Sequence, residues 1–143
     1  MFKSIFRTVA ISSALLFTSI EANACSIHYT ASDDIIELIQ EHKFGNTNYD
    51  QMCSELNKYG MQIEFLGLNY IAYGVTTATA TALVSDRKTG LSTGVMGMSI
   101  QLSSEASSDK AKSLLMDAIN NSLEAINLSN IEQSAKNLKG YEG

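Results

Sequence analysis

The sequence predicts an α+β fold, in which a three-stranded antiparallel sheet is packed by helices in the order α-α-β-β-β-α-α. Apolar residues recur with the helical period of about 3.6 in the first and last parts of the chain. Between residues 61 and 102 they alternate with the period of two that is typical of strands. Elements of one type are grouped along the chain, which favours an antiparallel sheet over the alternating order of parallel α/β folds.

Residues 1–24 have the three parts of a cleavable signal peptide. Lys3 and Arg7 precede an apolar stretch, and the segment ends in the small residues that a signal peptidase accepts. The apolar stretch is shorter than the ~20 residues needed to cross a bilayer. We therefore expect a single α+β domain over 25–143 that is periplasmic or secreted and makes no membrane contact after cleavage.

Cys25 and Cys53 are the only cysteines, and both follow the predicted cleavage point. Two thiols of an exported chain usually pair with each other in an oxidising compartment, so we expect a disulfide between them. Lipidation of Cys25 is an alternative, but the residues before it lack the aliphatic side chain of a lipoprotein signal. A tetrahedral metal site would use the cysteines with His28 and His42. Because a disulfide removes both sulfur ligands, we expect no metal.

Four helices are predicted from the apolar spacing and from capping residues. The first two cover residues 33–43 and 48–59, and we expect them to form an antiparallel hairpin. A capping box at Asp34 starts the first helix, and Gly60 ends the second. The third and longest helix starts at residue 107 or 108 and ends near 127, and a short last helix covers 129–139.

Three strands are predicted between the helix pairs. The first covers residues 61–66 and ends in a turn at 67–69, and the second covers 70–84. Threonine and alanine alternate along the second strand, which predicts a hydrated threonine face and an alanine face that a helix can approach closely. A polar hairpin tip at 85–90 leads to the third strand at 91–102, where Gly94 and Gly97 mark bulges or bends. We expect Met96 and Met98 to belong to the core with Met116.

Charge and motifs exclude several classes of function. The chain carries a formal charge of −5, and an acidic surface repels phosphate backbones and anionic lipid. The central α-β-β-β-α order resembles that of double-stranded-RNA-binding domains in topology only, and we expect no nucleic-acid binding. No serine lies in a nucleophile motif, and the carboxylates between 33 and 41 are typical of a helix start and a solvent face. We expect no enzymatic activity and no cofactor.

The leading hypothesis is a small exported protein-binding module. We expect an inhibitor or immunity-type protein that acts on an envelope toxin or hydrolase, with a basic cell-wall enzyme as the partner that an acidic chain would attract. A homodimer formed through a sheet edge is a second kind of partnership. The alternative function is a periplasmic carrier of a small ligand or metal, held between a Met/Ala sheet face and the long helix. The candidate partner-binding residues are Tyr70, Tyr73, Asp86, Arg87 and Lys88.

Overall fold

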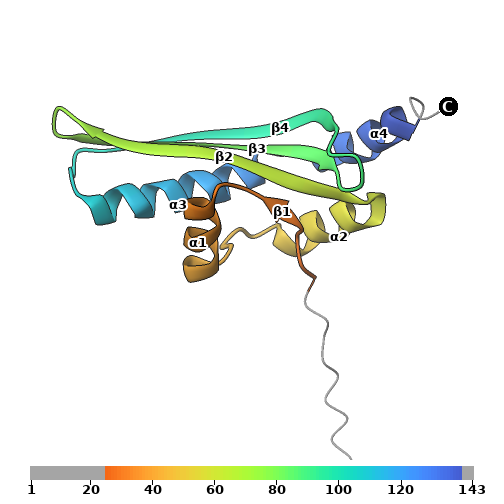
Figure 1. The fold of residues 1–143 in the computed structure, drawn as a ribbon, viewed down its shortest axis with the longest axis horizontal. Helices are drawn as coiled ribbons and strands as arrows, with labels where there is room; N and C mark the ends of the chain where they lie inside the picture. The colour runs from red at the N-terminus through yellow and green to blue at the C-terminus, as the bar shows by residue number, and fades with distance from the viewer. Residues whose placement is uncertain (1–24, 140–143) are drawn as a thin grey trace, which may run out of the picture.

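One four-stranded sheet is covered on one face by the first three helices of the described chain, and the last helix lies at the end of the sheet (Figure 1). The computed structural model describes residues 25–139, so the predicted signal peptide lies outside the described residues. The strands lie in the order β1-β2-β3-β4, with β1 parallel to β2 and the other neighbours antiparallel. Their bounds are Tyr29–Thr30 for β1, Met61–Ala72 for β2, Val75–Asp86 for β3 and Ser92–Ser103 for β4.

The α+β class is therefore confirmed, whereas the prediction of three strands is wrong by one. The extra strand β1 is only two residues long, and too short to show an alternating pattern. It forms where the N-terminal arm runs beside β2, with the Ile63 amide donating to the carbonyl of His28 at 3.0 Å. Only the tertiary position of the arm gives these two residues a strand to pair with.

The four helices are α1 (Asp33–His42), α2 (Tyr49–Tyr59), α3 (Ser108–Glu124) and α4 (Leu128–Lys139). Their predicted positions hold, but α3 ends earlier than expected and the capping box predicted at Asp34 is not used. Ser107 caps α3 by accepting from the amide of Lys110 at 3.2 Å. The predicted helix hairpin does not form, because α1 packs against α3 whereas α2 packs against α4 and β2.

The first hairpin turn lies further along the chain than predicted. Instead of turning at 67–69, β2 continues to Ala72, and the chain reverses through Tyr73 and Gly74. Gly67 has another role, since a Cβ there would lie 3.1 Å from Leu115 Cδ1 and 3.2 Å from the Thr79 carbonyl oxygen. This glycine allows a helix to approach the strand closely, which a sequence pattern cannot distinguish from a turn.

Small side chains also line the rest of the contact between the sheet and α3. The inward residues of β3 include Ala78, Ala80 and Ala82, all at most 1% exposed, so the predicted alanine face is confirmed. Gly97 pairs with Ala82 in the register of β3 and β4, and a Cβ on Gly97 would overlap the carbonyl oxygen of Ser122 in α3. Gly97 is thus a point of close contact, whereas the bulge predicted in this strand lies near Gly94, where the register shifts.

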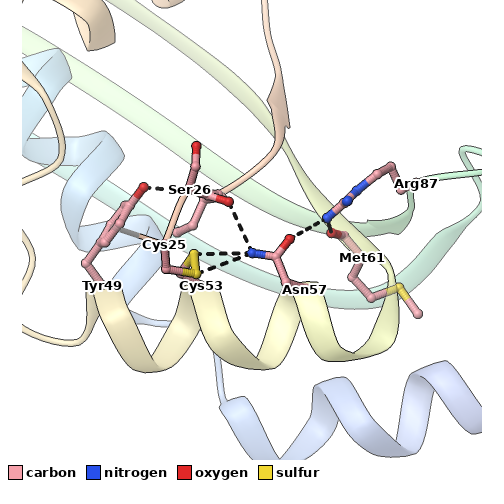
Figure 2. Close-up of a disulfide and its surroundings, with 8 residues drawn as sticks. Cys25, Ser26, Tyr49, Cys53, Asn57, Met61 and Arg87 are labelled. Carbon is pink, nitrogen blue, oxygen red and sulfur yellow. Dashed lines mark hydrogen bonds between the residues drawn. A yellow bond between two sulfur atoms is a disulfide. The ribbon is translucent and has the colours of Figure 1, made fainter. Parts of the chain in front are cut away.

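The predicted disulfide joins Cys25 to Cys53 in α2, with 5.9 Å between the Cα atoms. Asn57, one turn further along α2, donates to both sulfurs at 3.3 Å and to the carbonyl of Ser26 at 3.2 Å (Figure 2). Its amide oxygen accepts from Arg87 at 2.7 Å. One side chain therefore links the N-terminal arm, the disulfide and the turn between β3 and β4.

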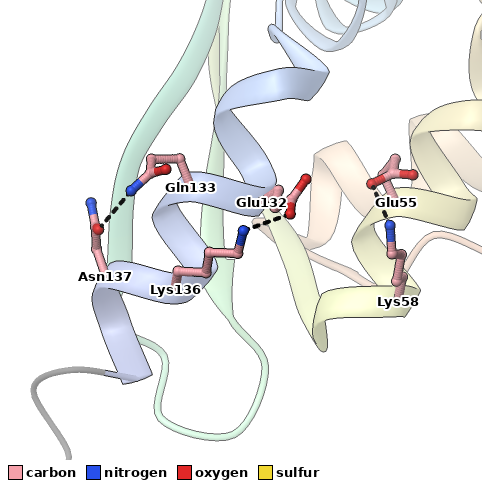
Figure 3. Close-up of polar contacts among 6 residues, drawn as sticks. All are labelled: Glu55, Lys58, Glu132, Gln133, Lys136 and Asn137. Carbon is pink, nitrogen blue, oxygen red and sulfur yellow. Dashed lines mark hydrogen bonds and ion pairs between the residues drawn. The ribbon is translucent and has the colours of Figure 1, made fainter.

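The last helix is attached by apolar contacts. Ile131 and Ala135 of α4 are 0% and 2% exposed, and the helix contacts α2 and β4. The ion pair of Lys136 with Glu132 at 2.7 Å lies on its surface (Figure 3). Because solvent screens exposed pairs, this one contributes little to stability, and burial of the apolar face holds α4 in place.

Replacing Gly97 by alanine is expected to destabilise the protein by at least about 2 kcal/mol, because the new methyl group overlaps backbone that cannot move independently. The matched control is Gly45→Ala, where the nearest atom, Nδ2 of Asn120, lies 3.9 Å away and a change within about 1 kcal/mol is expected. Urea unfolding followed by circular dichroism measures both. Equal losses for the two variants would contradict the close contact of α3 with β4.

Reducing the disulfide is expected to lower the free energy of unfolding by about 3–4 kcal/mol, because the open chain regains the entropy of the loop between the cysteines. Urea unfolding with and without reductant measures the change. The variant Cys25→Ser/Cys53→Ser is the control and should unfold at one urea concentration under both conditions. An unchanged unfolding midpoint on reduction of the native protein would show that the bridge stabilises little.

Candidate binding surface

The sheet face opposite the helices exposes a continuous apolar surface, which we call the outer face. Seven large side chains stand on it, each between 52% and 68% exposed. They form two columns, one on β2 and one on β4, which consist of Leu66, Leu68, Tyr70, Met96, Met98, Ile100 and Leu102. No described helix covers this face (Figure 1). Large apolar side chains exposed together in this way are typical of interaction surfaces.

A threonine column on β3 separates the two apolar columns. Thr79 lies between Leu68 and Ile100 in the strand register, and Thr81 and Thr77 occupy the levels on either side of it. These threonines are buried or half-buried between the larger side chains. The predicted threonine face is therefore present, but it is much less hydrated than expected because its neighbours are large.

The outer face carries almost no charge. Glu64, near the start of β2, and Asp86, the last residue of β3, are the only charged residues in the four strands. The acidic residues lie mainly in the four described helices, none of which covers the outer face. The molecule therefore has an acidic helical side and a neutral apolar side.

The large apolar side chains of β4 point away from the core. Met96 and Met98 were predicted to be core residues, but they point outward and are 52% and 61% exposed. Apart from Val95, which packs against the core, the inward positions of this strand hold small or polar residues, including Gly97 and Ser99. At Gly97 the close approach of α3 leaves no room even for a Cβ, and the large apolar side chains of β4 stand on the outer side. The methionines and the alanines lie on opposite faces of the sheet, so no single face combines them as the carrier hypothesis expected.

The hairpin joining β2 to β3 extends past the start of α3 (Figure 1). The last hydrogen bonds that hold it come from Asn69, which donates to the carbonyl of Ala111 in α3 at 3.1 Å, and from Thr76, which donates to the carbonyl of Glu105 in the link before α3 at 2.6 Å. Beyond them lies a tip made of Ile71, Ala72, Tyr73, Gly74 and Val75. Ile71 and Val75 are 46% and 40% exposed, although they are apolar.

Tyr73 and Gly74 form a two-residue turn in which both residues have positive φ, 51° and 78°. Such turns favour glycine, asparagine or aspartate, because a Cβ makes the left-handed conformation unfavourable. Tyr73 is also fully exposed, so no contact within the described part of the chain explains its presence. Of the sequence-predicted binding residues, Tyr73 lies at the tip and Tyr70 on the outer face beside it.

The other predicted binding residues lie at the opposite end of β3, separated from the tip by about 35 Å of strand. The Asp86 carboxylate accepts from the Thr89 amide at 2.7 Å and the Lys88 amide at 3.0 Å. These hydrogen bonds, with that from the Thr89 hydroxyl, hold the pKa of Asp86 below its ordinary value. Arg87 donates to Asn57 and to the Met61 carbonyl. Asp86 and Arg87 therefore stabilise the turn, and this turn and the tip are two separate surfaces.

The cysteine and histidine set and the carboxylates of α1 are the other candidate sites that the sequence contains. Cys25 and Cys53 are joined to each other, and within residues 25–139 no group of three or more His, Cys, Asp or Glu side chains is placed to hold a metal ion. Asp34, Glu37 and Glu41 line a cavity of about 290 Å³ between α1 and α3. A hydrogen bond with the Ser32 side chain lowers the pKa of the Asp34 carboxyl group.

Comparison with protein-family models, with curated proteins and with solved structures finds no match for this chain. None of the helices formed by the described residues is both long and apolar enough to span a membrane.

The hydrogen bonds to Asp86 yield a pH-dependent prediction. A lowered folded-state pKa means that its contribution to stability is complete above the ordinary value of 3.8 and is lost as the pH falls through the folded-state pKa. Asp86→Asn is expected to lower the free energy of unfolding by less than about 1 kcal/mol at pH 7, and by nothing measurable near pH 2. Urea unfolding of both proteins at the two pH values measures this. An equal loss at both would exclude a role for the charge.

Proposed function

We propose that this chain is an exported protein-binding module of the inhibitor or immunity type, which inserts the β2–β3 tip into a cleft of its partner. The observation that carries the proposal is Tyr73, a fully exposed aromatic residue held in a left-handed conformation at the end of a projecting hairpin. Ile71 and Val75 on either side add exposed apolar surface. A narrow apolar projection of this kind suits a concave site on another protein.

The strain at Tyr73 supports a binding role. A non-glycine residue in the left-handed region costs about 1–2 kcal/mol, and asparagine at the same position would relieve most of this. Strain of this kind is typical of functional positions, where a side chain serves something other than stability. Tyrosine is a common binding anchor, because it offers a large apolar area and a polar tip with few rotatable bonds.

The charge and the disulfide support the compartment and the class of partner. A disulfide is stable in the oxidising environment outside the cytoplasm, as expected of a periplasmic or secreted protein. The chain carries 15 acidic and 10 basic residues, and the helical side concentrates the acids. Such a field attracts a basic partner from a distance, which favours a cell-wall hydrolase or a toxin of basic character.

Tyr73→Asn separates binding from folding. Because asparagine tolerates the turn conformation, the variant is expected to be more stable by about 0.5–1 kcal/mol. It is also expected to bind the partner at least about tenfold more weakly, because an aromatic anchor is lost. The partner is first captured from native envelope extract at low salt by the tagged wild-type protein, and its affinity for both proteins is then measured by calorimetry.

Leu91→Asn is the matched control, since Leu91 is also apolar and 55% exposed but lies beyond the turn at the other end of β3. It should bind like the wild type. Weaker binding by both variants, or by neither, would show that the tip is not the contact surface. A partner retained unchanged in high salt would contradict the electrostatic part of the proposal.

A further inference from the structure

We propose that the outer face is an interface between two copies of this chain, which pack sheet against sheet about a two-fold axis. This assignment is independent of the tip, because it uses the two apolar columns and the threonine column between them. It also differs from pairing at a sheet edge, since it leaves the backbone of β4 unchanged and joins side chains only.

The size of the surface supports a second copy. Seven large side chains that are at least half exposed offer on the order of 700 Å² of apolar area. The largest apolar patch on a typical monomer is about 300–600 Å², whereas a stable interface buries about 800 Å² on each partner. The outer face therefore exceeds what a monomer usually exposes and approaches what a specific dimer needs.

The pattern of the surface is suited to pairing with itself. Positions of β2 and β4 that lie opposite each other across β3 both carry large apolar side chains, as Leu68 and Ile100 do on either side of Thr79. A two-fold axis that runs along the threonine column places the β2 column of one copy against the β4 column of the other. The threonine columns of the two copies then face each other. Two sheets packed in this way lie about 10 Å apart and form the core of a β-sandwich. An isologous contact requires this self-complementarity.

The distribution of charge allows two acidic chains to meet at this face. Apart from Glu64 near one end, the outward positions of β2, β3 and β4 are uncharged, and the helical acids of both copies would point away from the interface. A lipid surface is a poorer occupant, because the four strands contain no lysine or arginine to meet anionic headgroups. A basic partner would find almost no carboxylate here to pair with.

Analytical ultracentrifugation of the purified protein over a range of concentrations tests the proposal. The wild type should sediment with the mass of two chains, and Leu68→Lys with the mass of one, because each copy would bury an unpaired lysine charge in an apolar interface. Leu91→Lys is the control and should remain a dimer, since Leu91 has the same 55% exposure as Leu68 but lies outside the outer face. Circular dichroism shows whether each variant is folded.

A second measurement needs no variant. In protein labelled with ¹³C at the methionine methyl groups, the signals of Met96 and Met98 should shift on dilution as the interface opens. Those of Met52 and Met61, which are 1% and 2% exposed, should not move. Shifts confined to the first pair support the proposed interface.

Three outcomes would overturn the interface. A wild-type monomer at every concentration excludes a dimer, and a Leu68→Lys protein that still dimerises places the contact on another surface. Binding of the monomer to anionic or neutral lipid vesicles, lost in Leu68→Lys, would assign the face to lipid instead. Tyr73→Asn should leave the mass of two chains unchanged, so failure of the tip proposal and failure of the dimer are seen separately.

Discussion

The close approach of α3 to the sheet is the constraint from which the other features follow. The helix can lie this near because the residues of β3 that face it are alanines. Gly67 and Gly97 also have no Cβ to collide with Leu115 and the Ser122 backbone. Dense packing of small residues gives many favourable contacts between two rigid backbones. It also leaves no room for a Cβ at Gly97 on the inner side of β4, and the large apolar residues of that strand stand on the outer side.

The disulfide organises the second half of the helical layer. By holding Cys25 against α2, it brings the N-terminal arm alongside β2, where β1 forms at the sheet edge. Asn57 then connects the same site to Arg87 in the turn between β3 and β4. An edge strand, a helix and a distant turn are thus stabilised through one covalent link and one amide side chain. The opposite edge of the sheet, at β4, is contacted by α4.

These constraints divide the surface into regions with different chemistry. The helical side is acidic, the outer face is apolar and nearly uncharged, and the tip beyond α3 presents a strained tyrosine. The turn at Asp86 uses its polar groups for its own hydrogen bonds. A dimer formed through the outer face would leave both tips and both acidic sides accessible, so self-association and capture of a basic partner are compatible. The two proposals therefore describe one molecule that uses separate surfaces for separate contacts.

The sequence by itself determined the α+β class, the disulfide, the approximate helix positions and the alternation along β3, because these depend on local periodicity and cysteine number. It also identified Tyr70 and Tyr73 as candidate contacts. Alternation states which residues share a face but not which face the helices cover, and so the methionines of β4 were assigned to the wrong side. Strand β1, the turn at Tyr73 and the exposed outer face were decided only by the tertiary structure, because each depends on how closely distant segments approach one another.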